Sequence, residues 1–198
     1  MIDQDALEHM VRFHGHMCAG LALGARAADI ALRELGVGPG DVVAAVETHT
    51  CSVDAIQAMT GCTLGNGKLF YLDHAKNAYT FWGPDGAAVR VLALPDDRPP
   101  EVWDRFARVQ SGQASQEELA EFFAFQQEWS KAILETPQEQ LFRVERVDEA
   151  APSRPPISAP VVCADCGEAT MSAWAREVGG RRLCPPCTEK AGALGRLR

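Results

Sequence analysis

Residues 78–94, AYTFWGPDGAAVRVLAL, decide the fold class. Two runs rich in β-branched and aromatic residues, 78–82 and 87–94, favour strands. Between them stands Gly83-Pro84-Asp85-Gly86, a composition typical of a turn because glycine and proline adopt the backbone angles that a chain reversal needs. The stretch therefore predicts a hairpin, around which the rest of the chain is arranged.

Outward from the hairpin, the sequence alternates further strand patterns with helical ones. Strands are expected at 42–46, 68–73 and, at a sheet edge, 142–147. Helical periodicity is found at 5–14, 18–35, 53–59, 99–109 and 116–134. Ser52 is placed to cap the third helix, and Ser115 with Glu118 forms a capping-box pattern before the last. The prediction is an α+β fold with helices packed on a small, mainly antiparallel sheet.

Two helices carry further detail. The apolar face of the 116–134 helix consists of Phe122, Phe125, Trp129 and Ile133, a spacing typical of core packing. In the 18–35 helix, Gly20 and Gly24 lie one turn apart, where the missing side chains allow another backbone, a ligand or a partner helix to come close.

Composition excludes several classes of protein. The 198 residues are 46% hydrophobic and 23% charged, the balance of a globular chain rather than a collagen, coiled coil or disordered protein. The net charge of -8 repels a phosphate backbone, so nucleic acid is a poor candidate partner. An acidic start and the lack of a long apolar run predict a cytoplasmic protein without a membrane segment.

The charge is divided between two parts of the chain. Residues 151–198 contain seven Lys+Arg against four Asp+Glu, whereas residues 1–150 contain twelve against twenty-three. Between the parts, residues 151–160 are rich in proline and have no periodicity, as is typical of a semi-rigid linker. We therefore expect an α+β core domain at 1–150, a linker at 151–160 and a small basic domain at 161–198.

The small domain has the spacing of a structural zinc site. Cys163-Ala164-Asp165-Cys166 and Cys184-Pro185-Pro186-Cys187 are two pairs that can each present both thiolates to one ion, so we predict a Zn²⁺ bound by Cys163, Cys166, Cys184 and Cys187. The alternative, a redox dithiol, needs a thioredoxin-like context that so few residues cannot supply. A unit of this size also needs a metal to fold.

A second cluster of soft ligands lies in the core domain. His14, His16 and Cys18 lie within five residues of one another, in a glycine-containing loop before a helix, and Cys51 follows a predicted strand. We predict His16, Cys18 and Cys51 as a second metal site with an open fourth position, and His14 and Cys62 as alternates. A metal-free thiol pocket is the competing interpretation.

Other polar residues are less informative. His9 and His49, taken singly, are more typical of packed core histidines than of ligands. Asp73, His74 and Lys76 follow a predicted strand and either face the same cleft or lie on a solvated turn, and the sequence leaves both alternatives open.

Three ordered motifs resemble the FmdE family, proteins like the FmdE component of formylmethanofuran dehydrogenase, named after the operon of that molybdenum enzyme. They are FHGHMCAGLALGARAA at 13–28, TCSVDAIQAMTGCTLGNGKL at 50–69 and DHAKNAYTFW at 73–82. The C-terminal cysteine segment is similar to treble-clef zinc fingers of the DksA/TraR type.

The resemblance implies a homodimer whose cleft is lined by the loop before the long helix and by the strand-end cysteine. Carried onto this sequence, the functional positions are His14, His16, Cys18, Cys51, Asp54 and Cys62. The family usually has proline after the loop cysteine, whereas Ala19 stands here, which puts the rigidity of the helix entry in question.

Two function classes follow. One is a zinc-binding protein with a His/Cys-lined cleft for a metal or small ligand, acting as accessory or partner subunit of a molybdenum-dependent one-carbon enzyme. The other is a metal- or ligand-sensing regulator whose finger docks a partner protein. The sequence leaves open whether the cleft catalyses a reaction, and whether the finger is a dimer clasp or a docking module.

Overall fold

The computed structural model describes residues 2–95, 98–154 and 156–192. The chain divides into two compact units, Met1–Ala151 and Pro152–Arg198. Within the described residues, none of the helices combines the length and apolar character of a membrane span.

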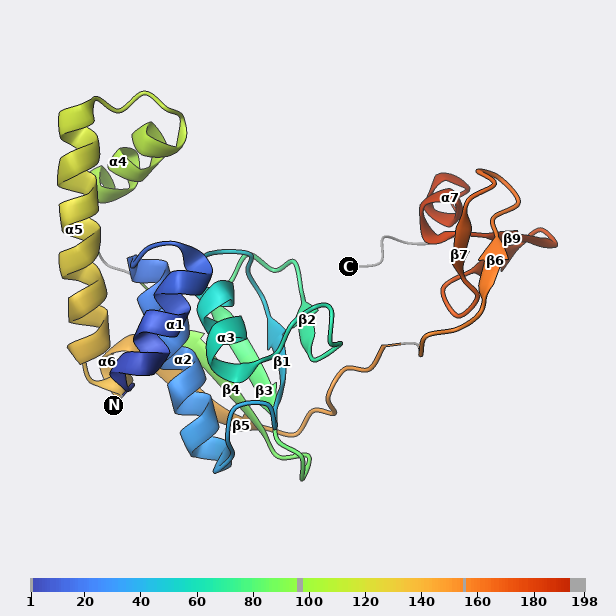
Figure 1. Cartoon of the computed structure of the whole chain (residues 1–198), viewed down its shortest axis with the longest axis horizontal. Helices are drawn as coiled ribbons and strands as arrows, with labels where there is room; N and C mark the ends of the chain where they lie inside the picture. Colours follow the sequence, from blue (N-terminus) through green and yellow to red (C-terminus); the bar gives the residue numbers. More distant parts are fainter. Residues whose placement is uncertain (1, 96–97, 155, 193–198) are drawn as a thin grey trace. The chain divides into compact units, whose positions relative to one another are not determined.

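The described residues of the larger unit, the body, form six helices and five strands, which Figure 1 labels. The helices are α1 (Gln4–His14), α2 (Ala19–Leu35), α3 (Ser52–Thr60), α4 (Pro100–Gln110), α5 (Gln116–Glu135) and α6 (Gln138–Leu141). The strands are β1 (Val43–Val46), β2 (Leu69–Tyr71), β3 (Ala78–Trp82), β4 (Ala88–Ala93) and β5 (Phe142–Val147).

The strands form one sheet in the order β2-β1-β3-β4-β5. Only the β1–β2 pair is parallel, and β3 and β4 form the predicted hairpin, with Ala78 opposite Leu92. Strand β5 lies at the edge, as its sequence predicts. The mixed fold with a small, mainly antiparallel sheet is therefore confirmed.

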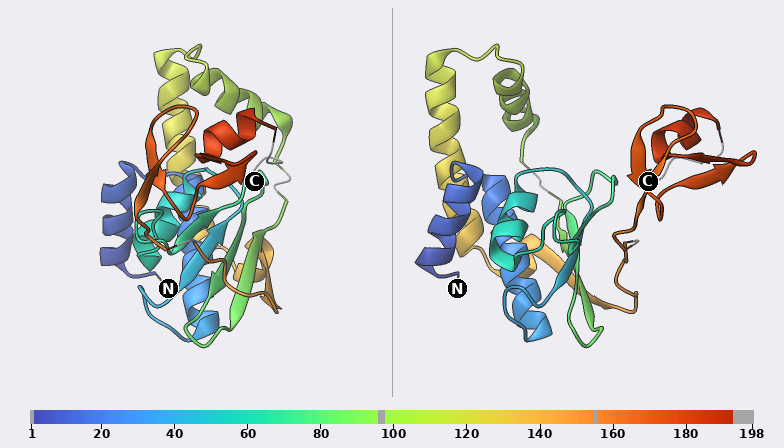
Figure 2. Two further views of the ribbon diagram at one scale, coloured as in Figure 1. Left: turned by 90° about the vertical axis from the view of Figure 1, so that its right-hand side faces the viewer. Right: turned by 45° about the vertical axis from the view of Figure 1, so that its right-hand side comes forward.

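Helices α2 and α3 cover one face of the sheet, and α1 packs against these helices on the side away from the sheet (Figure 2). The main core lies between these helices and the sheet, and its largest buried side chains include Ile30, Ile56, Tyr79 and Phe81. Alternation along β1 places Ala44 and Val46 in this core, whereas Ala45 packs with Trp82 and Ala88 in a separate cluster. The sheet thus holds β1 in a fixed register, with its carboxyl end beside α3.

Helices α2 and α3 approach each other closely at Gly24. A β-carbon there would overlap the Ser52 carbonyl oxygen, and one at Gly20 would lie 3.1 Å from the Cys51 Cβ. The two glycines therefore let the start of α3 pack against the first turns of α2. This contact brings residues 51–54 next to the loop that precedes α2.

Helix α5 lies along α2 and is fixed at two points. Gln126 accepts a hydrogen bond from the Ala19 amide at 3.0 Å, and Arg26 donates to the carbonyl oxygens of Ile133, Leu134 and Thr136 at 2.8 Å each. The capping box of Ser115 and Glu118 is present as predicted.

The aromatic face of α5 is only partly buried. Phe122 and Ile133 are buried, whereas Phe125 and Trp129 are half-buried. Helix α4 packs its Phe106 edge-on against Phe122, with ring centroids 4.9 Å apart. The expected core packing therefore applies fully to the two ends of the face, at Phe122 and Ile133, and only partly to the middle.

The prediction that Ser52 caps α3 was wrong. Cys51 occupies the N-cap position, and the Ser52 hydroxyl lies 2.9 Å from that of Thr50. The close approach of Gly24 to the Ser52 backbone accounts for the difference, because it draws Ser52 into the buried first turn of the helix.

The smaller unit, the finger, consists of two short hairpins followed by a helix. Its elements are β6 (Pro160–Val162), β7 (Ala169–Met171), β8 (Arg176–Val178), β9 (Arg181–Leu183) and α7 (Pro185–Lys190). Strands β6 and β7 pair around the first cysteine pair, and β8 and β9 pair around the turn at Gly179 and Gly180. Leu183 and three of the cysteines form its small core.

Candidate functional site

A cavity of about 430 Å³ lies between the end of β1, the start of α3 and strand β2. The residues around it include His14, His49, Cys51, Asp54, Leu64 and Tyr71. Strand β1 ends at Val46 and α3 begins at Ser52, so residues 47–51 form the connecting loop at the carboxyl end of β1. Functional groups commonly gather at such strand ends.

His14, the last residue of α1, is held by a carboxylate from α3. Its Nδ1 lies 2.7 Å from Asp54 Oδ2, and its Nε2 lies 3.7 Å from Cys18 Sγ. A neutral imidazole that donates from Nδ1 to the carboxylate has a free lone pair on Nε2. This is the arrangement of a metal-binding histidine with a supporting carboxylate, and here the lone pair points toward a thiol.

Cys18 and Cys51 form a coupled pair of thiols. Cys18 is the N-cap residue of α2, and its Sγ accepts a hydrogen bond from the Leu21 amide at 3.4 Å. The hydrogen bond between the two thiols raises the pKa of Cys18 and lowers that of Cys51 to about 6. Burial acts in the opposite direction on the pKa of Cys51, and the neighbouring His14 adds to the lowering. The lowered pKa favours the thiolate form of Cys51, a residue that lines the cavity.

His16 completes a group of three potential ligands. Its ring packs on that of His14 with centroids 4.8 Å apart. The ligand atoms of His14, His16 and Cys18 all lie within 4.8 Å of one another, close enough to converge on one ion after small movements. Gly15 makes this possible because its φ of +101° ends α1 and turns the chain back toward Cys18.

The structure thus brings most of the predicted site residues together and leaves one of them apart. It brings together His14, His16 and Cys18, places Asp54 behind His14, and joins Cys51 to Cys18. It does not bring Cys62 to this cluster. That thiol is fully buried in the main core and donates to the Val42 carbonyl oxygen at 3.2 Å.

His49 was missed as a cavity residue. The sequence favoured packed core positions for His9 and His49, but both are exposed. His49 Nδ1 lies 3.2 Å from the Tyr71 hydroxyl, which donates to Asp73 Oδ1 at 2.8 Å. The available signal was position, since His49 follows the same strand end that presents Cys51.

The structure also places Asp73 and His74, for which the sequence left two alternatives open. Asp73 supports a cavity residue, whereas His74 turns to Glu47, at 3.0 Å from its carboxylate. Arg90 donates to the same carboxylate at 2.7 Å. Burial disfavours the charge on Glu47, but the hydrogen bonds from Arg90 and His74 lower its pKa below the usual range. This network fixes the chain immediately before the cavity loop.

The finger brings its four cysteines together as predicted. The sulfur atoms of Cys163, Cys166, Cys184 and Cys187 lie within 4.8 Å of one another, a geometry that fits a bound metal such as zinc. Gly167, with φ of +75°, closes the first pair through a hydrogen bond from its amide to the Cys163 carbonyl at 3.0 Å. The second pair begins α7, with Cys184 at its N-cap.

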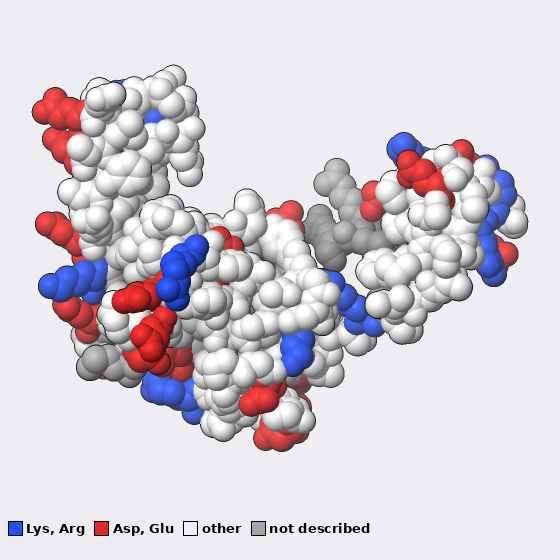
Figure 3. Space-filling view, viewed as in Figure 1, with Lys and Arg blue, Asp and Glu red and all other residues white. Residues whose placement is uncertain are grey.

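The finger thiols differ in their protonation. Amide hydrogen bonds from Cys166, Cys184 and Asp165 lower the pKa of Cys163 to about 6. The hydrogen bond with Cys184 raises the pKa of Cys187 to about 12. Metal binding would displace the remaining protons. Figure 3 shows several Lys and Arg side chains on the surface of this unit. Arg176, Arg181 and Arg182, in the β8–β9 hairpin, are exposed.

Comparison with known proteins identifies the family of the chain. Residues 13–143 match the model of the family described as FmdE, molybdenum formylmethanofuran dehydrogenase operon. The chain belongs to the FmdE family. A solved structure similar to this FmdE chain is that of a tungsten formylmethanofuran dehydrogenase FmdE-like protein from Syntrophus aciditrophicus. It is 25% identical with a TM-score of 0.59, and the match covers 96% of this chain and 94% of the other.

A curated relative of this FmdE chain comes from Archaeoglobus fulgidus and is described as a probable S-adenosyl-L-methionine-binding protein. The two are 35% identical over 188 residues. The match covers 88% of this chain and 50% of the relative, so the chain spans about half the relative's length.

Proposed function

We propose that the body of this FmdE protein holds a metal ion through His14, His16 and Cys18, and that the fourth ligand position faces Cys51 and the cavity. The observation that carries the proposal is the pair of contacts made by His14. Asp54 accepts from one ring nitrogen, and the other nitrogen faces Cys18 Sγ. A thiolate and two imidazoles favour zinc or another borderline-soft ion. A site with three protein ligands leaves room for water or a substrate.

Elemental analysis of protein purified without added metal tests this proposal. We expect two ions per chain in the wild type, one in the finger and one in the body, and one ion per chain in His14→Ala/Cys18→Ala. A matched control is Cys62→Ala, which removes a body thiol that lies in the core, away from the cluster. This control should retain both ions, and a single ion in the wild type would contradict the proposal.

The role that we propose for the cleft is to bind a small ligand for a molybdenum- or tungsten-dependent one-carbon enzyme, with this chain as an accessory or partner subunit. Support comes from the description of the family and from the FmdE-like protein of similar structure. Co-purification of the chain with such an enzyme, in a cell that contains both, is the direct test. Association that survives deletion of residues 152–198 would assign the contact to the body.

S-adenosyl-L-methionine is a specific candidate for the ligand. The relative's description supports it, as does a cavity whose volume is in the range of small-molecule sites. Calorimetric titration of the full chain with this compound tests the candidate, and Cys51→Ala should weaken the binding because the thiolate attracts the sulfonium charge.

For the finger, we propose a zinc-bound treble clef that acts as a clasp in a homodimer. The order of knuckle, hairpin and helix supports this type of finger. The opposite net charges of residues 151–198 and residues 1–150 favour contact between a finger and the body of a second chain. Light scattering should give twice the 21.4 kDa chain mass. Loss of the dimer on deletion of residues 152–198 supports the clasp.

The second candidate function is a cytoplasmic metal- or ligand-sensing regulator, and the separate, basic finger unit is the observation that favours it. In that case, deletion of the finger would leave the dimer intact and would abolish binding to an acidic partner protein. The same deletion therefore separates a clasp from a docking module.

A further inference from the structure

We propose that the cavity selects small organic ligands whose polar head donates hydrogen bonds and is neutral or positively charged, and discriminates against ligands with an anionic head. The inference rests on the proposed function in that it assigns a ligand to the same cleft. The selectivity is assigned to the chain without an ion in the body, because a cation with an open ligand position would itself attract an anionic head.

The first observation is the size and apolar character of the cavity. At about 430 Å³ it is far larger than a metal ion needs, and it falls within the range of small-molecule sites. Val53, Leu64 and Leu69 contribute apolar surface beside the ring of Tyr71. A ligand with an apolar or aromatic body therefore fits this wall.

The second observation is that His49 is held as a hydrogen-bond acceptor. The Tyr71 hydroxyl has one proton, which it donates to Asp73 Oδ1 at 2.8 Å. Its oxygen can therefore only accept from His49 Nδ1, at 3.2 Å, so this nitrogen carries the ring proton. The neutral ring then has its lone pair on Nε2. Because His49 lines the cavity, that lone pair is available to a ligand N–H or O–H.

The third observation is the charge of the groups around the cavity. Asp54 contributes a carboxylate, oriented by His14 at 2.7 Å and by the Gln57 amide at 3.3 Å. Cys51 contributes a sulfur atom on the same side. Among the described residues that line the cavity, there is no Lys or Arg. An anionic head would thus approach acceptors without a basic side chain to offset them, whereas a cation would be attracted.

A test uses three probes that share a phenylmethyl body and differ in the charge of the head: benzylamine, benzyl alcohol and phenylacetate. Each is titrated at millimolar concentration into the full, isotope-labelled chain after chelation, which leaves the body folded, while backbone amide signals of the body are recorded by NMR. We expect benzylamine and benzyl alcohol to shift the amides of residues 48–54 and 71. Benzylamine should bind at least about threefold more tightly than phenylacetate, the effect of one partly exposed charge interaction.

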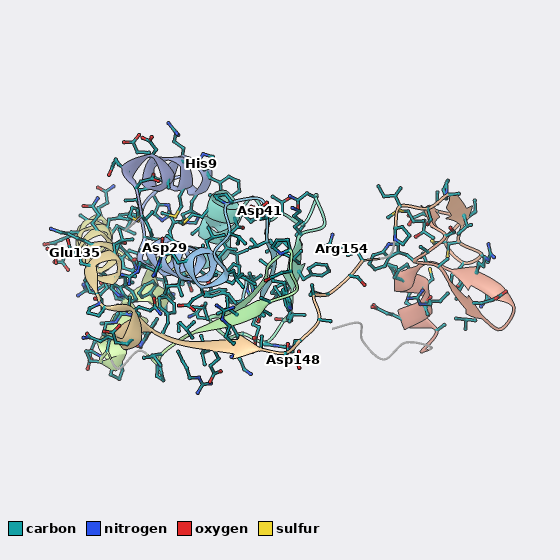
Figure 4. The ribbon with its side chains drawn as sticks, turned by 90° about the horizontal axis from the view of Figure 1, so that it is seen from below. His9, Asp29, Asp41, Glu135, Asp148 and Arg154 are labelled. Atoms are coloured by element: carbon teal, nitrogen blue, oxygen red, sulfur yellow. The ribbon has the colours of Figure 1, made fainter. Side chains whose placement is uncertain are left out.

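Variants assign the selectivity to its residues. His49→Phe keeps a ring but removes the acceptor, so it should weaken benzyl alcohol binding. Tyr71→Phe should weaken benzyl alcohol binding less, because this change removes only the hydroxyl group that orients His49. Asp54→Asn should reduce the preference for benzylamine. The matched control is His9→Gln, which changes an exposed histidine of α1, labelled in Figure 4, and should have no effect.

Several results would overturn the inference: phenylacetate binding as tightly as benzylamine, no shift of the cavity amides with any probe, or His49→Phe and Tyr71→Phe both behaving like His9→Gln. Signals from the sheet core report whether each variant is folded. A different result would contradict the proposed function. A body without a metal ion in the elemental analysis would remove the metal centre and leave this selectivity intact, whereas a metal-loaded body that shows no selectivity after chelation would do the reverse.

Discussion

The finger and the cleft cluster, which consists of His14, His16, Cys18 and Cys51, present similar donor atoms in different ways. The finger's four sulfur atoms come from two pairs, each closed by a short turn, and all four point at one centre. The cleft cluster takes its groups from the end of α1, the loop before α2 and the start of α3, and it adjoins a cavity. The finger is therefore built as a closed structural site, and the cluster as an open one.

The two sites also differ in the apolar core that supports them. The finger's own core is Leu183 with three of the ligating cysteines, so the site and the fold of this unit depend on each other. The cleft cluster rests on α2 and α3, which also pack in the main core, and that core contains none of the cluster's residues. Removing metal should therefore unfold one unit and leave the other folded.

The largest effect is expected from chelation of the finger metal, or from Cys163→Ala. Either change should abolish the ordered structure of residues 160–190, because this unit has little apolar core besides its cysteines. The NMR signals of the body should persist. Loss of all signals in a single transition would show that the two units are not independent.

The next effect concerns the contact between α2 and α3. Gly24→Ala places a methyl group against the Ser52 backbone, and we expect it to destabilise the body by about 3 kcal/mol. Chemical denaturation measures this change. The matched control is Gly38→Ala, whose new β-carbon would lie 3.6 Å from the Asp41 carboxylate, an ordinary contact. Equal stabilities of the two variants would refute the close approach.

Features whose residues lie close together in the sequence could be predicted from it, whereas contacts between distant residues could not. The capping box of Ser115 and Glu118, the β3–β4 hairpin and the finger cysteines involve near neighbours, and local chemistry predicted them. The His14–Asp54 contact joins residues forty positions apart. Only the packing of α2 against α3 brings them together, and no local pattern encodes it.

A similar limit explains the individual errors. The Ser52 prediction used local capping preference, which the contact with Gly24 overrides. The exposed place of His49 beside Tyr71 likewise depends on which strands become neighbours. Strand neighbours are a property of the folded sheet rather than of either segment.

A smaller effect is expected from Asp54→Asn. The amide is a weaker acceptor than the carboxylate, so it supports the Nδ1–H form of His14 less strongly. We expect the affinity of the body site for metal to fall by about 10- to 100-fold. Competition with a chromogenic chelator measures this affinity. The finger site provides an internal control, and its affinity should not change.

The smallest effect is a shift in thiol reactivity. In metal-free protein, alkylation of Cys51 should reach half its maximal rate near pH 6, because its lowered pKa makes the reactive thiolate dominant above that pH. Cys18→Ala removes the main cause, so the midpoint should move upward toward that of an ordinary cysteine. Mass spectrometry of the labelled peptide follows the reaction. A midpoint that does not move would contradict the coupling of the two thiols.

X-ray absorption by the metal in Cys163→Ala/Cys166→Ala, a variant whose finger site is destroyed, tests the two-site account most directly. We predict one ion per chain, with nitrogen neighbours at about 2.0–2.1 Å from His14 and His16 and sulfur at about 2.3 Å from Cys18. A variant that retains no ion, or an ion surrounded by sulfur alone, would contradict the account.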